Sequence, residues 1–262
     1  MSRCAEAATR HLAPLRATPA GRALAELMAG SAAPVLLERS FRLSAAGLAD
    51  GRFLLSVAAT AAPPELLPAL AALGLPEAPR ESIRAALPGA AMLHLGIEAG
   101  DVLKAYVERP DGFAPDGGAG PPLHRAWKWR PGSDAVAMDR YMLVPPHQAR
   151  ERLMQVPAPL QPALWAAMAA LEAKPGWLFL LDVLGAGTRR SLDIRCYDFE
   201  RSIGDLAGAI GTAALALGCD TAGLGPHLAE QLGHLAFGSD ATGGLFLTVY
   251  AGAERCDPGM LA

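Results

Sequence analysis

This 262-residue sequence has little net charge and no long apolar run. A formal net charge of −3 excludes a general electrostatic attraction to nucleic acid or to acidic membranes. Any binding site for an anion must therefore be a local cluster of Lys and Arg. Every apolar run is shorter than the ~20 residues that a membrane-spanning helix needs, so we expect no membrane span.

Cysteine is scarce, and its spacing is not that of a metal or redox site. The four cysteines are Cys4, Cys196, Cys219 and Cys256, and none belongs to a CxxC pair. This spacing excludes the common zinc and redox motifs. We interpret the four residues as reduced thiols, buried or on the surface, of a cytoplasmic protein.

The N-terminal segment lacks the uninterrupted apolar core of a secretory signal peptide. Residues 1–30 are richer in Arg than in acidic residues, a composition that also occurs in transit peptides. We predict an ordinary amphipathic helical region over residues 4–29. The 52% hydrophobic fraction, mostly Ala and Leu, favours a packed α/β protein over a disordered one.

A pair of strand-like runs recurs five times along the chain. The two runs of each pair are separated by turns of Gly, Asp, Pro or Ser, which are hairpin signals. The ten predicted strands are Val35–Leu43, Arg52–Thr60, Ala90–Ile97, Val102–Arg109, Leu123–Arg130, Ala137–Val144, Trp177–Leu184, Ser191–Tyr197, Leu232–Gly238 and Leu245–Ala251.

Helical periodicity fills most of the segments between the hairpins. We predict helices within residues 64–87, 145–173, 201–217 and 226–232. The exception is segment 110–122, whose Gly and Pro content predicts a mobile loop. This loop lies between two hairpins of one repeating pattern, so we see no domain linker and expect a single domain over residues 1–262.

Repeated hairpins predict an antiparallel sheet, and ten strands are near the limit for an open twisted one. Closure into a barrel ringed by helices removes the exposed edges. A barrel of this size is wider than one filled by its own side chains, so we predict a central chamber. Two packed sheets are the alternative architecture.

The only four tyrosines of the chain all fall on the second strand of a predicted hairpin: Tyr106, Tyr141, Tyr197 and Tyr250. Lys104 and Arg195 precede two of them by two positions, which places cation and phenol on one strand face. Equivalent positions on neighbouring strands would form a ring of cations and phenols that could bind a diphosphate. A single such motif is more often a solvated outer face, and the recurrence favours the ring.

The motifs Lys104-Ala-Tyr106, Arg195-Cys-Tyr197 and Thr248-Val-Tyr250 resemble the strand motifs of the ABBA prenyltransferases. The segment from Pro34 to Phe41, with Glu38, is similar to their first strand, and Arg52 falls where a diphosphate-binding arginine is expected. The short chain is most similar to the peptide-modifying branch from ribosomal peptide pathways. The sequence departs from the family at Thr248, where a cation is usual, and in the third hairpin, which offers Lys128, Arg130 and Arg140.

The resemblance implies a ten-stranded barrel and a transferase. Its implied diphosphate ligands are Arg52, Lys104, Lys128 and Arg195, and the implied shield for an allylic carbocation is Tyr106, Tyr197, Tyr250 and Trp127. Glu38 is the expected catalytic base; a structural salt bridge with Arg39 or Arg42 is the alternative. Trp127 and Trp129 share one strand face and Lys128 the other, so only one of these faces can line the chamber.

The function that we predict is transfer of a dimethylallyl or geranyl group from its diphosphate to a peptide side chain or a small aromatic or guanidine acceptor. Mg²⁺ could assist the leaving diphosphate, although no acidic cluster in the sequence requires it, and no organic cofactor is expected. Segment 110–122 would border the acceptor entrance.

A barrel that binds a hydrophobic or anionic ligand without chemistry is the main alternative to this function, and a purely structural protein is the third possibility. The position of Glu38 distinguishes the transferase from these alternatives, because a catalytic base must share the chamber with Lys104 and Arg195.

Other polar residues have simpler interpretations. His94, His124 and His234 show no ligand spacing in the sequence and are interpreted as core histidines. Asp182 and Asp193 could oppose one another in a hairpin, although pairing of Asp193 with Arg195 is simpler. The segment from Gly185 to Arg190 lacks the phosphate-loop pattern and is interpreted as a hairpin turn.

Overall fold

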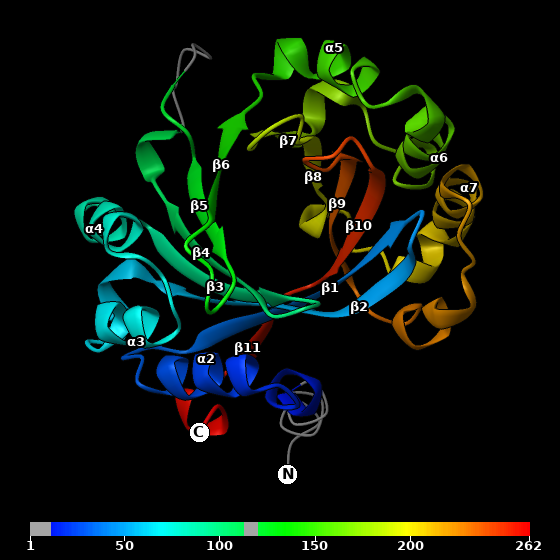
Figure 1. Cartoon of the computed structure of the whole chain (residues 1–262). Coiled ribbons are helices and arrows are strands. Elements are labelled where there is room, and N and C mark those ends of the chain that lie inside the picture. Colours follow the sequence, from blue (N-terminus) through cyan, green and yellow to red (C-terminus); the bar gives the residue numbers. More distant parts are fainter. Residues whose placement is uncertain (1–11, 113–119) are drawn as a thin grey trace.

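A computed structural model of the protein describes residues 12–112 and 120–262. Within this part, one antiparallel sheet contains eleven strands, and β1 also pairs with β10, which closes ten of them into a barrel (Figure 1). The predicted closure is therefore confirmed. The strands are β1 (Val35–Ser44), β2 (Gly47–Ala58), β3 (Met92–Glu98), β4 (Val102–Glu108), β5 (His124–Trp129), β6 (Val136–Leu143), β7 (Phe179–Leu184), β8 (Arg190–Arg195), β9 (Leu232–Ser239), β10 (Leu245–Ala251) and β11 (Glu254–Cys256).

The eleventh strand, β11, was not predicted. Its three residues pair with Val35–Leu37, at the start of β1, outside the ten-strand ring. A segment this short carries too little alternation for a sequence pattern to detect.

Helices surround the barrel in two groups (Figure 1). Helices α2 (Pro19–Ala29), α3 (Leu66–Ala72) and α4 (Glu77–Ala86) cover β1–β5, and α5 (Ala149–Met154), α6 (Gln161–Ala170) and α7 (Ala207–Leu217) cover the other side. Each group packs on its own apolar cluster, built from the outward faces of the strands. None of these helices combines the length and the apolarity needed to cross a bilayer.

Local chemistry explains the helix boundaries. Thr18 caps α2 by accepting a hydrogen bond from the Gly21 amide (3.0 Å), and Pro19 occupies the first turn, where no amide donor is needed. The predicted helix at 226–232 is wrong: Ala222–His227 forms 3₁₀ turns and Leu232 already begins β9. Pro226 lies inside those turns and cannot donate a backbone hydrogen bond.

Two predictions fall partly outside the described residues. Residues 1–11 of the predicted N-terminal helical region, with Cys4, and residues 113–119 of the predicted loop are not described. At the start of that loop, Pro110–Gly112 forms a 3₁₀ turn.

Strand alternation separates an outer apolar face from a polar and aromatic lumen. Trp127 and Trp129 both point outward into the cluster beneath α2–α4, where the Trp129 indole donates a hydrogen bond to the Leu73 carbonyl (2.9 Å). The prediction that Trp127 lines the chamber is therefore wrong. Since Lys128 lies between the two indoles on the strand, the period of two directs it inward.

Truncation of the buried Trp129 should destabilise the fold strongly. Its side chain is 2% exposed, so Trp129→Ala should lower the free energy of unfolding by about 3–5 kcal/mol through lost packing and an unfilled cavity. Urea denaturation monitored by circular dichroism measures this loss. Trp177, which is 73% exposed, provides the control, and Trp177→Ala should change stability by less than about 0.5 kcal/mol. Equal losses in both variants would contradict the packing described here.

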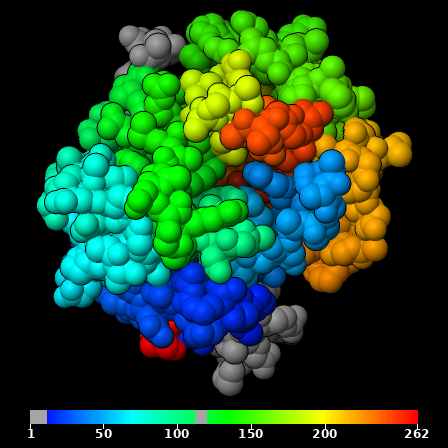
Figure 2. Space-filling view, viewed as in Figure 1, coloured from blue at the N-terminus to red at the C-terminus, as the bar shows by residue number. Residues whose placement is uncertain are grey.

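The two ends of the barrel differ. The hairpin turns lie at one end, and the connections to the helices lie at the other. Gly47 and Gly100 have φ angles of 102° and 74°, a left-handed conformation that permits the tight β1–β2 and β3–β4 turns. The surface is hollowed near the centre of Figure 2, between the β1–β2 segment in blue and the β9–β10 segment in orange-red.

Candidate active site

Inward side chains form two adjacent regions in the barrel lumen. The first, which we call the cationic end, lies near the hairpin turns and contains Arg42, Arg52, Lys104, Lys128 and Arg189. The second, the main cavity, has a volume of about 490 Å³ and opens toward the helix connections. Its polar and aromatic lining comprises Glu38, Ser56, His94, Tyr106, Glu108, His124, Tyr141, Asp193, Arg195, Tyr197, His234 and Tyr250.

Glu98 connects two of the cations at the cationic end. Its carboxylate accepts from Arg52 (2.8 Å) and forms an ion pair with Lys104. Burial lowers the pKa of Lys104 well below its usual value, and the nearby Arg52 charge lowers it further. The site therefore holds its positive charges under electrostatic stress that an anionic ligand would relieve.

Asp139 is the second internal carboxylate of this end. It lies 2.5 Å from the Lys128 ammonium and 2.9 Å from Nε of Arg189, and it is fully buried. Burial lowers the pKa of Lys128 to about 7. Among the described residues, these two carboxylates form ion pairs with four of the five cations, and the fifth, Arg42, donates a hydrogen bond to Thr248 instead.

The free space between these cations is small. It amounts to about 10 Å³, close to the ~10–15 Å³ that one water molecule occupies. A diphosphate can therefore enter only if side chains move. The movement that the ion pairs suggest is displacement of the Glu98 carboxylate, so that phosphate oxygens replace it beside Lys104 and Arg52.

Arg42 supplies the cation that the sequence lacks at Thr248. The two residues are register partners across the β1–β10 closure, and Nε of Arg42 donates to Oγ1 of Thr248 (3.2 Å). Arg189 likewise enters the cationic end from the β7–β8 turn, which is a hairpin turn as predicted. The sequence reasoning missed both arginines because neither belongs to a cation-x-Tyr motif.

Glu38 lies in the main cavity, 6% exposed, and accepts a short hydrogen bond from the Tyr197 hydroxyl. Burial raises the pKa of Glu38 to about 7, against the opposing effects of the Tyr197 hydrogen bond and the Arg195 charge. A carboxyl group with this pKa can accept a proton near neutral pH. The alternative of a salt bridge from Glu38 to Arg39 or Arg42 does not hold, since Arg39 pairs with Glu230 (2.6 Å) and Arg42 bonds Thr248.

Tyr141, Asp193 and Tyr250 line both regions and so form the boundary between them. The ring of Tyr106 meets that of Tyr141 edge-on, with centroids 5.7 Å apart. Ser191 donates to Asp193 (3.0 Å), and burial raises the pKa of Asp193 to about 6. A chain that extends from the cationic end into the main cavity must pass these aromatic rings, whose faces attract positive charge.

The structure groups Arg52, Lys104 and Lys128 but places Arg195 apart from them. The Arg195 guanidinium lies in the main cavity, 4.8 Å from the ring centroid of Phe179 and 5.7 Å from that of Tyr197. Tyr197 lies just beyond β8, in the 3₁₀ turn Tyr197–Phe199, so its motif is shifted along the barrel axis. In β8, Ser191 and Asp193 face the cationic end instead.

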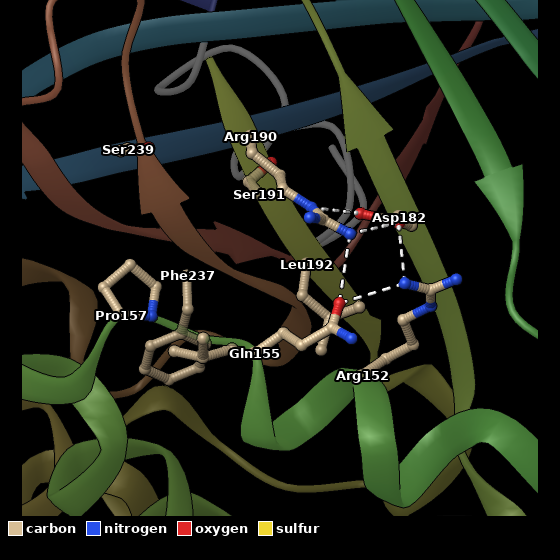
Figure 3. A pocket seen from close by; sticks show the side chains of 10 residues that line it. Arg152, Gln155, Pro157, Asp182, Arg190, Ser191, Leu192, Phe237 and Ser239 are labelled. Atoms are coloured by element: carbon tan, nitrogen blue, oxygen red, sulfur yellow. Dashed lines mark hydrogen bonds and ion pairs between the residues drawn. The ribbon is translucent and has the colours of Figure 1, made fainter. Parts of the chain in front are cut away.

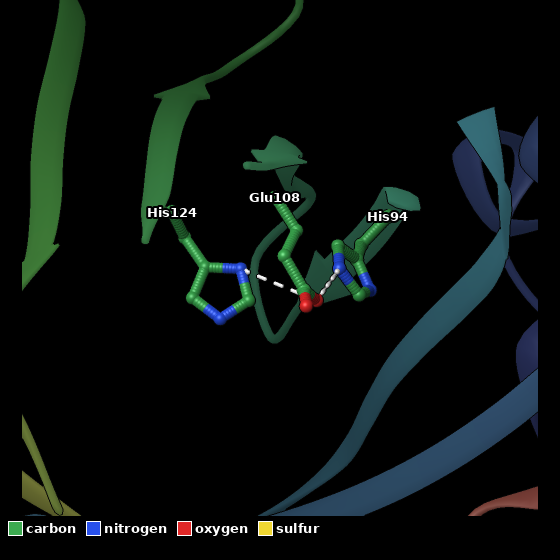
Figure 4. Close-up of side chains that lie close together, drawn as sticks. All are labelled: His94, Glu108 and His124. Carbon is green, nitrogen blue, oxygen red and sulfur yellow. Dashed lines mark ion pairs between the residues drawn. The ribbon is translucent and has the colours of Figure 1, made fainter. Parts of the chain in front are cut away.

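Three side chains without a predicted functional role meet on neighbouring strands (Figure 4). Oε2 of Glu108 lies 3.4 Å from Nε2 of His94 and 3.9 Å from Nδ1 of His124. Their contact follows from register, because His94 pairs with Tyr106 and Glu108 pairs with His124. Together with His234, these histidines line the main cavity. The prediction that they are core histidines is therefore wrong.

A further cavity of about 110 Å³ lies outside the barrel, between α5 and the β7–β8 hairpin (Figure 3). Asp182 faces this side and pairs with Arg190 (3.0 Å) and Arg152 (3.9 Å). Asp182 and Asp193 therefore point to opposite faces of the sheet and are not opposed carboxylates. The charges of this outer cavity are satisfied by one another.

Neither a protein-family profile nor a curated protein sequence matches the chain. Its fold, by contrast, matches several solved structures. A structure named 6-dimethylallyl tryptophan synthase aligns with a TM-score of 0.59 and 14% identity, over 93% of this chain and 94% of that one. The apo form of prenyltransferase PriB aligns with a TM-score of 0.57 and 14% identity, over 96% of each chain. NotF prenyltransferase aligns with a TM-score of 0.51 and 11% identity, over 85% of this chain and 81% of that one. At these identities the likeness shows the fold, which is the PT barrel of the ABBA prenyltransferases.

Proposed function

Because the chain has the fold of the ABBA prenyltransferases, we propose that it transfers a short allylic group from its diphosphate to an acceptor held beside Glu38. The observation that carries this proposal is the division of one lumen into the cationic end and the main cavity. The main cavity is lined by aromatic rings and contains the Glu38 carboxyl group, whose pKa is about 7. The two regions match the two demands of the reaction, namely a charged leaving group and a shielded carbocation.

In the proposed reaction, the diphosphate binds at the cationic end and its allylic chain extends past Tyr141 and Tyr250. The C–O bond of the donor breaks, and the diphosphate leaves with the electron pair. Lys104, Lys128 and Arg52 stabilise the charge that develops on it. The phenol rings face the allylic cation and keep water away from it.

The acceptor attacks from the main cavity. Its nucleophilic atom forms the new bond to the allylic carbon, and Glu38 accepts the proton that the acceptor loses. The cavity volume of about 490 Å³ lies within the ~300–1,000 Å³ range of small-molecule sites. A carboxylate at this position suits an N–H-bearing acceptor, either an indole or a guanidine, free or as a peptide side chain.

The described residues at the cationic end do not fit a resident Mg²⁺ ion. Mg²⁺ prefers an octahedral set of oxygen ligands with several waters. Glu98 and Asp139 instead each pair with two cations. We therefore assign the neutralisation of the leaving group to the cations of the chain.

Calorimetry with donor analogues tests the proposal. The dimethylallyl and geranyl S-thiolodiphosphates, whose C–S bonds resist ionisation, should bind with micromolar dissociation constants and more tightly than inorganic pyrophosphate. The difference between the two affinities would measure the binding free energy that the allylic chain contributes in the main cavity. Titrations with and without Mg²⁺ show whether the ion accompanies the donor.

The acceptor is then sought by incubating the protein with dimethylallyl and geranyl diphosphate and with tryptophan, arginine or peptides containing them. Mass spectrometry would detect the added prenyl group. No analogue binding by folded protein, with and without Mg²⁺, would refute the proposal. Analogue binding without transfer to any acceptor would favour the non-catalytic binding barrel.

A further inference from the structure

We propose that His94, Glu108 and His124 bind a divalent transition-metal ion of the Zn²⁺ type inside the main cavity. The three residues come from β3, β4 and β5, which are adjacent in the sheet, and Figure 4 shows their side chains converging. Among the described residues, this is the one group of His, Cys, Asp and Glu side chains close enough together to share an ion.

The spacing of the donor atoms supports this assignment. All three lie within 4.8 Å of one another, and two of the separations are 3.4 Å and 3.9 Å. In a tetrahedral zinc site with bonds of about 2.1 Å, ligand atoms lie about 3.4 Å apart. Small side-chain rotations therefore suffice to complete the site, while the strands hold the three Cα positions.

The chemistry of the donor atoms also suits a metal of this type. The three donors are two imidazole nitrogens, from His94 and His124, and one carboxylate oxygen, from Glu108. Zn²⁺ and related transition-metal ions bind such a mixed set of nitrogen and oxygen ligands, whereas Mg²⁺ prefers oxygen ligands alone.

Two buried nitrogens aimed at the site have no partner in hydrogen-bonding geometry: Nε2 of His94 and Nδ1 of His124. On the far side of its ring, Nδ1 of His94 lies 2.7 Å from Oγ of Ser56. When Nδ1 donates to this hydroxyl, Nε2 is left as the metal-binding atom. Outer partners of this kind fix the ring orientation of metal-binding histidines.

A metal held by three protein ligands keeps a position for a fourth. His94, Glu108 and His124 line the same cavity as Glu38, so that position faces the space proposed for the acceptor. If the acceptor is free tryptophan or arginine, as the proposed function allows, its amino or carboxylate group could occupy this position. The ion would then hold the acceptor in the main cavity. The ion itself would stay apart from the cationic end, because the positive charges there repel it.

Titration of chelator-treated protein with ZnCl₂ tests the site independently of any activity. We expect one equivalent of Zn²⁺ to bind with a micromolar or lower dissociation constant and Mg²⁺ to leave the site unfilled. His94→Ala, His124→Ala and Glu108→Gln should each weaken Zn²⁺ binding at least tenfold. His234 is a half-buried histidine of the same cavity that lies outside the cluster, and His234→Ala should leave Zn²⁺ binding unchanged. Circular dichroism confirms that each variant is folded.

Two further measurements sharpen the test. Co²⁺ in place of Zn²⁺ should give visible absorption that the His124→Ala variant loses. Arg195→Gln should tighten Zn²⁺ binding severalfold, because the Arg195 guanidinium lines the same cavity and its positive charge repels a cation. The proposal is refuted if the wild type binds no Zn²⁺, or if the double variant His94→Ala/His124→Ala binds it as the wild type does. Donor-analogue binding is measured separately, so the two proposals can fail independently.

Discussion

Replacement of Glu38 by glutamine should lower the turnover of prenyl transfer by about 10²–10⁴-fold, the usual contribution of a general base. Glutamine keeps the shape of the side chain and can still accept the hydrogen bond from Tyr197. What it loses is the ability to take the acceptor proton. Steady-state kinetics with the acceptor found by mass spectrometry measure the loss, and thiolodiphosphate affinity should stay within about threefold of the wild type because Glu38 lies outside the cationic end.

The pH dependence distinguishes a base from a positioning group. Because burial raises the pKa of Glu38 to about 7, kcat/KM for the acceptor, measured at saturating donor, should rise tenfold per pH unit below pH 7 and level off above it. This rising limb should be absent from Glu38→Gln. Tyr197→Phe is the matched control: its missing hydrogen bond normally lowers the pKa of Glu38, so the limb should move to higher pH.

The same pKa shift has a consequence for stability. A carboxyl group whose folded pKa is raised stabilises the fold fully below its unfolded pKa of about 4.5, and this contribution is lost as the pH rises through about 7. Glu38→Gln should therefore be more stable than the wild type above pH 7. An inactive variant that is also unfolded would not support a catalytic role, whereas unchanged turnover would remove Glu38 from the mechanism.

Replacement of Lys104 by glutamine should weaken binding of the thiolodiphosphates by about 30- to 1,000-fold. Truncation of one partner of a buried, hydrogen-bonded charge pair costs about 2–4 kcal/mol, and each 1.4 kcal/mol is a factor of ten. Calorimetry measures the change. Arg140→Ala removes a cation from the exposed outer face of β6 and should leave the affinity unaltered.

Proton uptake should accompany donor binding. Burial lowers the pKa of Lys104 and brings that of Lys128 to about 7, and a bound diphosphate would raise both toward their ordinary values. At pH 8 the complex should therefore take up protons, which calorimetry in buffers of different ionisation enthalpy detects. Affinity should fall as the pH rises above 7, because Lys128 loses its charge.

Glu98→Gln should strengthen binding of the donor analogue, the opposite of what is expected for Lys104→Gln. It removes the carboxylate that pairs with Arg52 and Lys104 in the free protein, so the analogue should bind about tenfold more tightly. The free variant should be less stable, since two buried cations lose their partner, and saturating ligand should restore the stability. Weaker analogue binding in this variant would show that Glu98 does not compete with the diphosphate.

The five hairpins could be predicted from the sequence because turn residues and alternating runs are local signals. The same alternation correctly placed Lys104 with Tyr106 on one inward face, and it related Trp127, Lys128 and Trp129 to one another. It could not say which of the two faces of β5 points inward. Both faces are buried, one beneath helices and one toward the lumen, so each tolerates aromatic side chains.

The sequence thus determined the five hairpins, their order and the inward tyrosines. Tertiary structure alone decided which side chains meet. Closure of β1 on β10 brings Arg42 to Thr248, 206 residues away in the chain, and repairs the missing cation. The β3–β4–β5 register gathers His94, Glu108 and His124, and the displacement of Tyr197 beyond β8 separates Arg195 from the other cations. These contacts depend on strand register around a closed barrel, which residue spacing along one strand does not encode.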